Sequence, residues 1–125
     1  MLNKIYYTGY EGQGSVKIWS DEDGKEMGFL IWIGFFETIL QGCFKLSFQK
    51  EGLIECYYNH NGFYDYKWKM FHPHIVLDEL MNFNENLLET TDKEIIKTSK
   101  ELIEQLISFI NISIRNERNI YVEYD

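Results

Sequence analysis

The sequence predicts a small α+β domain: an antiparallel meander of about six strands, two C-terminal helices on one face, and a final short edge strand. Up to about residue 71, apolar residues recur with a spacing near two, and glycine and Asx residues separate the apolar runs. After Pro73 the spacing changes to that of a helix. The 125 residues match the commonest size of a domain, which predicts that 1–125 is a single domain.

Short turns join the predicted strands, which favours an antiparallel meander because parallel strands need long crossovers. Val16 and Ile18 precede the acidic turn Asp21-Glu22-Asp23-Gly24, whose Asp-Gly ending suits a hairpin. Asn61-Gly62 is the strongest turn signal, since both positions of a type I′ turn require positive φ. Alternating apolar and polar side chains predict further strands at residues 44–49, 54–58 and 64–70.

The run from Met27 to Phe36 would be apolar on both faces if it formed one strand. Such a strand lies inside a sheet that is covered on both sides, or it uses one face for a partner. We prefer the first interpretation, and a homodimer formed through Met27–Phe36 is the alternative.

Pro73 ends the strand region, and a short helix is expected from Ile75 to about Asn84. A longer helix follows, for which Thr91 and Glu94 form a capping box at the start. Its broad apolar stripe predicts that it packs on the sheet. The last strand, Asn119 to Glu123, is expected at a sheet edge with Ile120 and Val122 pointing inward.

The formal net charge of −8 limits the classes of partner. It would repel nucleic acid and anionic membrane surfaces, and no cluster of Lys and Arg offsets it. A basic protein is the partner that this field would attract. The alternative is that the acidic residues only keep the protein soluble.

Cys43 and Cys56 are too few for a disulfide scaffold, and both lie in apolar runs where a thiol behaves as a small buried hydrophobe. The N-terminus lacks the apolar core and cleavage site of a signal peptide. The longest apolar run, Met27–Phe36, is far shorter than the ~20 residues that span a bilayer. These observations predict a cytoplasmic protein.

No catalytic, metal or cofactor site is predicted, so we expect a protein that is not an enzyme. The three histidines, His60, His72 and His74, lack zinc-ligand spacing and are interpreted as surface or capping residues. Cys43, His60 and Asp65 could be named as a nucleophile, base and acid, but Cys43 is better explained as the first residue of a strand.

Two further loops resemble ligand sites only superficially. The acids of residues 21–26 lack the alternating spacing and distal Glu of an EF-hand. The glycines of residues 9–14 lack the Lys-Ser/Thr pair of a phosphate-binding P-loop. Both are therefore interpreted as solvated turns.

The segment from Tyr57 to Trp68 concentrates aromatic and amide side chains around one predicted hairpin. Tyrosine and tryptophan are over-represented at binding hot spots, because they bury a large area at low entropic cost. Half of these rings are expected to be core, but Tyr57, His60 and Asn61 cannot all be buried.

In size, charge and order of elements the whole chain resembles the small acidic immunity proteins of bacterial polymorphic-toxin and contact-dependent inhibition systems. Many of these are single α+β domains that act as decoys for basic toxin domains. The resemblance therefore implies an inhibitor that occludes the active site of a basic toxin domain, such as a nuclease. The expected contacts come from two hairpins, and they are Asp21, Glu22, Asp23, Glu26, Tyr57, His60, Asn61 and Asp65.

The alternative function is small-molecule binding or catalysis in a pocket between the sheet and the long helix, lined by Tyr64, Tyr66 and Trp68. The two hypotheses differ in what they require of the surface. An inhibitor needs acids and rings that are exposed together, whereas the alternative needs an enclosed cavity.

Overall fold

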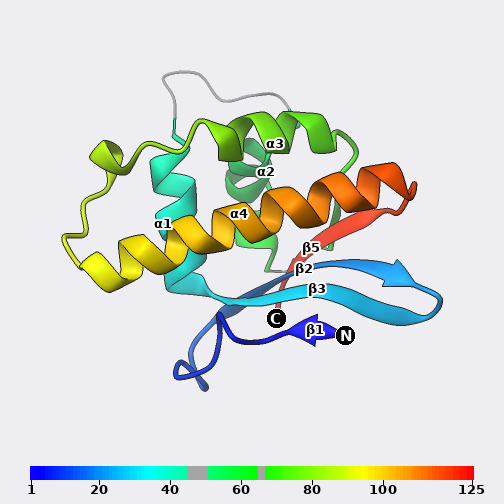
Figure 1. Ribbon diagram of the computed structural model, residues 1–125, viewed down its shortest axis with the longest axis horizontal. Helices are drawn as coiled ribbons and strands as arrows, with labels where there is room; N and C mark the ends of the chain where they lie inside the picture. The colour runs from blue at the N-terminus through cyan, green and yellow to red at the C-terminus, as the bar shows by residue number, and fades with distance from the viewer. Residues whose placement is uncertain (45–50, 65–66) are drawn as a thin grey trace.

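The structure is a computed structural model and describes residues 1–44, 51–64 and 67–125. Its sheet has the strand order β1-β3-β2-β5-β4, and the helices cover one face of this sheet (Figure 1). The strands are β1 (Leu2–Asn3), β2 (Ser15–Glu22), β3 (Lys25–Trp32), β4 (Trp68–Lys69) and β5 (Ile120–Tyr124). The helices are α1 (Ile33–Gly42), α2 (Leu53–Asn59), α3 (Pro73–Met81) and α4 (Lys93–Arg115), with short 3-10 turns η1 (Asn61–Phe63) and η2 (Glu85–Leu87).

The α+β class is confirmed, but the predicted six-stranded antiparallel meander is wrong. Across the described residues the sheet has five strands, and it is mixed because β1 pairs parallel with β3. The same part of the chain forms four α-helices instead of two. β5 is not at the edge: it lies between β2 and β4, because Trp68 and Lys69 pair with its outer side.

The hairpin of β2 and β3 is as predicted. Asp21 pairs with Glu26 and Glu22 with Lys25, so the turn consists of Asp23 and Gly24, at φ 52° and 82°. The side chain of Asp21 accepts the Gly24 N–H at 2.8 Å and closes the turn.

The apolar run from Met27 to Phe36 is not one strand. The chain leaves the sheet at Trp32 and starts α1 at Ile33. The buried apolar side chains of α1 are Phe35, Phe36, Ile39 and Leu40, and their spacing is helical. The first part of the run therefore belongs to β3 and the second part to α1. Its large inward side chains are buried within the same chain, which accounts for the run without a second copy.

The strands predicted at residues 54–58 and 64–70 are also corrected. Residues 53–59 form α2, which buries Leu53, Ile54 and Cys56. Asn61 and Gly62 do adopt positive φ, at 52° and 69°, but they follow α2 in η1 and join no two strands. Among the described residues of the predicted strand 64–70, Trp68 and Lys69 form a strand, and residues 65–66 lie outside the description, as does most of the strand predicted at 44–49.

The two C-terminal helices are confirmed, with one change at the start of α4. The N-cap is Asp92, whose side chain accepts the N–H groups of Glu94 and Ile95, so the capping box with Thr91 is wrong. Both β5 side chains predicted to point inward, Ile120 and Val122, are buried. None of the described helices combines the length and apolar character needed to cross a membrane.

One hydrophobic core lies between the sheet and the helices. Phe29 of β3 meets Phe109 of α4 edge to face, with ring centroids 5.8 Å apart. Trp68 of β4 stacks on Phe63 of η1 at 5.6 Å. This contact holds η1, and the end of α2 that precedes it, against β4 at the edge of the sheet.

Candidate functional site

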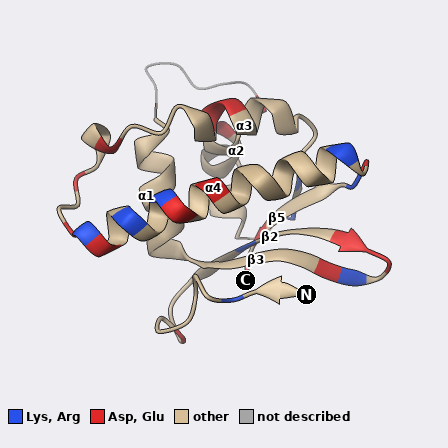
Figure 2. Cartoon of the chain, viewed as in Figure 1, with Lys and Arg blue, Asp and Glu red and all other residues tan. Residues whose placement is uncertain are grey.

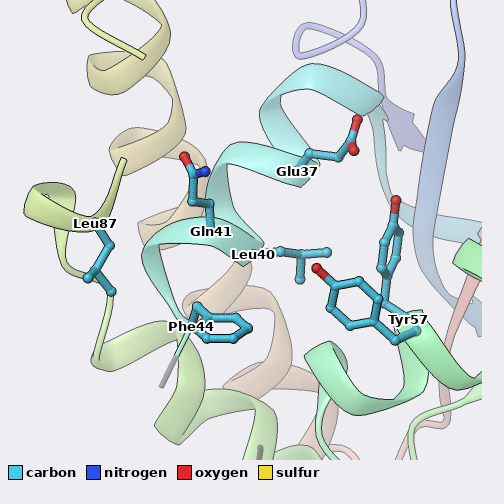
Figure 3. A pocket seen from close by; sticks show the side chains of 7 residues that line it. Glu37, Leu40, Gln41, Phe44, Tyr57 and Leu87 are labelled. Carbon is cyan, nitrogen blue, oxygen red and sulfur yellow. The ribbon is translucent and has the colours of Figure 1, made fainter. Parts of the chain in front are cut away.

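A groove of about 390 Å³ lies between α1, α2 and η2, and we call it the α1–α2 groove. Figure 3 shows Leu87 and Tyr57 on opposite sides, with Leu40 between them. Most of its lining is apolar or aromatic, and the lining residues are Glu37, Leu40, Gln41, Phe44, Tyr57, Tyr58 and Leu87. Pockets of this volume are large enough for a small molecule or for one or two side chains of another protein.

One face of α1 forms the first wall. Glu37, Leu40, Gln41 and Phe44 follow the i, i+3, i+4, i+7 spacing, which places them on the same side of a helix. Leu40 is buried and forms the base of the groove, whereas Phe44, just beyond the end of α1, is 45% exposed. Apolar surface therefore continues from the core to the outside of the groove.

The η2 segment is fastened to α1 and supplies the second wall. The Gln41 side chain accepts the Glu89 N–H at 2.9 Å, and the Asn84 N–H donates to the Gly42 carbonyl at 2.7 Å. These two bonds bracket η2 and hold Leu87 in the lining, where it is 45% exposed.

Two tyrosines at the end of α2 form the third wall. Tyr57 is half-buried and packs against Phe36 and Phe63, with centroid distances of 5.6 and 5.8 Å. Tyr58 is 61% exposed, and its ring stands at 88° to that of Tyr57. Burial, and next the charge of Glu37, raise the pKa of the Tyr57 hydroxyl above its ordinary value.

Glu37 is the one charged residue in the described lining of the groove. It is exposed, and it forms no hydrogen bond or ion pair with the described part of the chain. A carboxylate beside aromatic rings, without a cation of its own, can receive a cation from outside.

The predicted acidic hairpin is largely engaged within the chain. Glu22 pairs with Arg118 at 3.0 Å, and Glu26 pairs with Lys17 at 2.8 Å. Asp21 closes the turn through its side chain, and it remains exposed, as does Asp23 at the tip. Along α4, segments of Lys and Arg alternate with segments of Glu (Figure 2), so the acids of this helix are not grouped together.

The structure does not bring the two predicted groups of contact residues together. The hairpin tip extends to one end of the molecule, away from α2 (Figure 1). Tyr64, just after η1, contacts Tyr124, which pairs with Val16 at the other end of β2. Five residues of strand, about 17 Å, separate Val16 from Asp21.

Of the contacts predicted near the second hairpin that lie among the described residues, Tyr57 lines the groove, whereas His60 and Asn61 do not. His60 is half-buried between α2 and η1, and Asn61 is exposed in the turn that follows. Asp65 lies outside the described residues, as does Tyr66. The groove residues that the sequence did not predict as contacts are Tyr58 of α2, Leu87 of η2, and four residues on or just after α1: Glu37, Leu40, Gln41 and Phe44. For the last four, the i, i+3, i+4, i+7 spacing was the available signal.

The residue types of reactive or metal sites are dispersed. His72 and His74 are exposed, and both cysteines are buried without forming a disulfide. Cys43 follows α1 instead of starting a strand. Across residues 1–44, 51–64 and 67–125, no group of three His, Cys, Asp or Glu side chains could hold a metal ion.

The region between the sheet and α4, where the alternative hypothesis expects a pocket, is filled by side chains. Ile18 of β2 and Leu106 and Ile110 of α4 are at most 2% exposed. Trp68 is buried in the core, and Tyr64 lies exposed on the surface, so these two do not line a shared cavity.

Comparison of the chain with protein-family models, with curated proteins and with solved structures found no match.

Proposed function

We propose that this chain is a protein-binding inhibitor of the immunity type, which docks a basic protein in the α1–α2 groove and occludes the functional surface of that protein. The observation that carries the proposal is the lining of the groove: exposed rings and aliphatic side chains with one unpaired carboxylate, Glu37. Aromatic side chains in a concave, partly desolvated surface are typical anchors of protein interfaces.

The charge of the chain supports a basic partner. The net charge of −8 produces a negative field that attracts cationic proteins and speeds their encounter. Specificity then depends on short-range contacts, which the groove can supply because Tyr57 is held against Phe36 and Phe63 and needs little reordering.

The groove is a better docking site than the acidic hairpin. Glu22 and Glu26 already have basic partners within the chain, so a protein docking there would have to compete with those ion pairs. At the groove, by contrast, Glu37 has its charge unmatched by the described residues.

The proposal is for binding instead of catalysis. The described lining holds one carboxylate and two tyrosines, and it includes no histidine, cysteine or serine to act as a base or nucleophile. The expected action is therefore steric: the bound partner is prevented from reaching its own substrate.

The test is affinity purification from the native cell with three tagged forms of the chain. The groove variant carries Tyr58→Ser and Leu87→Ser, two exposed positions whose replacement leaves the core intact. The control is Phe71→Ser, an equally exposed ring that is not in the groove. We expect one basic protein to be retained by the wild type and the control and lost by the groove variant.

The purified partner then allows a direct measurement. Titration calorimetry should give 1:1 binding that weakens as salt is raised, and the bound partner should lose its activity. Equal affinity for the wild type and the groove variant would remove the groove from the interface. A partner that remains fully active in the complex would reject inhibition.

The volume of the groove favours a second candidate, binding of a small molecule. Native mass spectrometry of the chain purified from its own cell distinguishes the two. A stoichiometric small ligand that is absent from the Tyr58→Ser/Leu87→Ser variant would favour this candidate over the inhibitor.

A further inference from the structure

The two tyrosines of the α1–α2 groove form a corner. Their ring centroids are 5.5 Å apart, and the planes are perpendicular, so the groove presents a ring face and a ring edge side by side. Tyr57 cannot turn freely because it packs against Phe36 and Phe63. The Tyr57 side of the corner is therefore in place before any ligand binds.

Glu37 is close enough to this corner for its charge to act on Tyr57. Besides burial, the Glu37 carboxylate is the leading cause that raises the pKa of the Tyr57 hydroxyl. Glu37 lies one to two helical turns before Gln41 and Phe44 on the same face of α1, and Figure 3 shows it at the rim, on the side of the groove where Tyr57 lies.

A negative charge next to ring faces is the arrangement that recognises organic cations. We infer that the α1–α2 groove binds an arginine side chain of the partner, with its guanidinium paired to the Glu37 carboxylate and stacked on the Tyr57–Tyr58 corner. The inference rests on the proposed function and names the anchor of that interface.

Arginine fits this site better than lysine. A guanidinium is planar, so it can stack on a ring while its N–H groups donate to both oxygens of one carboxylate. An ammonium is a compact, strongly hydrated charge that gains less from a ring face. The aliphatic stem of arginine would lie on Leu40, and Phe44 and Leu87 add apolar lining on the side of Leu40 away from Tyr57 (Figure 3).

The test uses three peptides and does not require the natural partner. They are acetyl-Gly-Leu-X-Leu-Gly-amide with arginine, citrulline or lysine at X; citrulline keeps the shape of arginine but has no charge. Binding is followed by NMR titration of the labelled chain. We expect the arginine peptide to bind at least tenfold more tightly than the citrulline peptide, with shifts at Glu37, Gln41 and Tyr58.

Two variants assign that preference to the site. Glu37→Gln should bring the affinities for the arginine and citrulline peptides to within about threefold, while the control Glu104→Gln, an exposed acid on α4, should preserve the difference. Tyr58→Leu retains an apolar contact but removes a ring face, so it should reduce the same ratio. Circular dichroism verifies that each variant is folded.

The outcomes that overturn the inference are specific. The inference is wrong if the wild type binds none of the peptides, or if it binds the arginine peptide no more tightly than the citrulline or the lysine peptide. It is also wrong if Glu37→Gln keeps the wild-type preference for the arginine peptide over the citrulline peptide. If one of these occurs while the purified partner still fails to bind the Tyr58→Ser/Leu87→Ser variant, the proposed function stands and only the arginine anchor is wrong. If the peptides behave as expected but the partner binds that variant normally, the proposed function is wrong.

Discussion

The buried carboxylate of Glu79 in α3 accepts the backbone N–H of Leu53, the first residue of α2, at 2.6 Å. The same carboxylate accepts the Ile54 N–H at 3.4 Å, and a Cβ on Gly52 would come within 2.7 Å of it. Glu79, which is distant in sequence, thus caps the N-terminus of α2, because Gly52 at the N-cap position has no side chain that could accept these N–H groups. It fixes the helix that carries Tyr57 and Tyr58.

Replacing Glu79 should destabilise the protein and loosen the groove. Glu79→Gln keeps an acceptor oxygen but loses the charge at the helix N-terminus, so we expect a loss of about 1 kcal/mol in the free energy of unfolding. Glu79→Ala leaves buried N–H groups without this acceptor and should cost about 3 kcal/mol. Urea denaturation measures both, with Glu104→Ala as the exposed control; a Glu79→Ala variant as stable as that control would contradict the capping role.

Gly28 is expected to be irreplaceable in β3. Its φ of +144° is rare for residues with a side chain, and a Cβ there would lie 2.1 Å from the Ile18 carbonyl oxygen. Gly28→Ala should therefore cost about 3 kcal/mol or more. Gly12→Ala is the matched control: its φ is also positive, at +89°, but a Cβ would meet nothing within 4 Å, so we expect about 1 kcal/mol. Comparable losses in the two variants, measured by thermal and urea denaturation, would argue against the steric explanation.

Elements with a strong local signal could be predicted from the sequence. The Asp23-Gly24 turn is determined by residues that tolerate positive φ, and α4 shows a long apolar stripe. Pro73 stands at the first position of α3, where its missing N–H costs nothing. In each case the deciding interactions lie within a few residues of one another.

Elements decided by tertiary contacts could not be predicted. In α2, the apolar residues Leu53, Ile54 and Cys56 fit a helix as well as a strand, and Glu79 from α3 is the group that caps the helix. In the candidate site, Tyr57 was expected because aromatic residues are concentrated around it. Glu37 was not expected in the site, because its position there depends on α1 lying beside α2.

The start of α4 distinguishes two N-caps that differ by one residue. The Asp92 side chain accepts the N–H groups of Glu94 and Ile95 at 3.0 and 3.2 Å, whereas the sequence pattern favours Thr91. Asp92→Ala should therefore lower the free energy of unfolding by about 1 kcal/mol, and Thr91→Ala should change it by less than about 0.5 kcal/mol. Urea denaturation of the two variants measures the difference, and the reverse order would restore the capping box.

The thiol of Cys56 should make the fold sensitive to alkaline pH. Burial, together with the charges of Glu51, Glu55 and Glu79, raises the pKa of this thiol from 9.0 to about 12. In the unfolded chain the thiol ionises near its ordinary pKa, so the unfolded state releases a proton that the folded state retains. The stability contributed by the neutral thiol is complete below pH 9 and is lost as the pH rises toward 12.

Because other groups also titrate in this range, we compare the wild type with Cys56→Ala by urea denaturation at pH 8 and pH 10.5. The stability of the wild type should fall more steeply between the two values, whereas parallel decreases would show that Cys56 is not the group responsible.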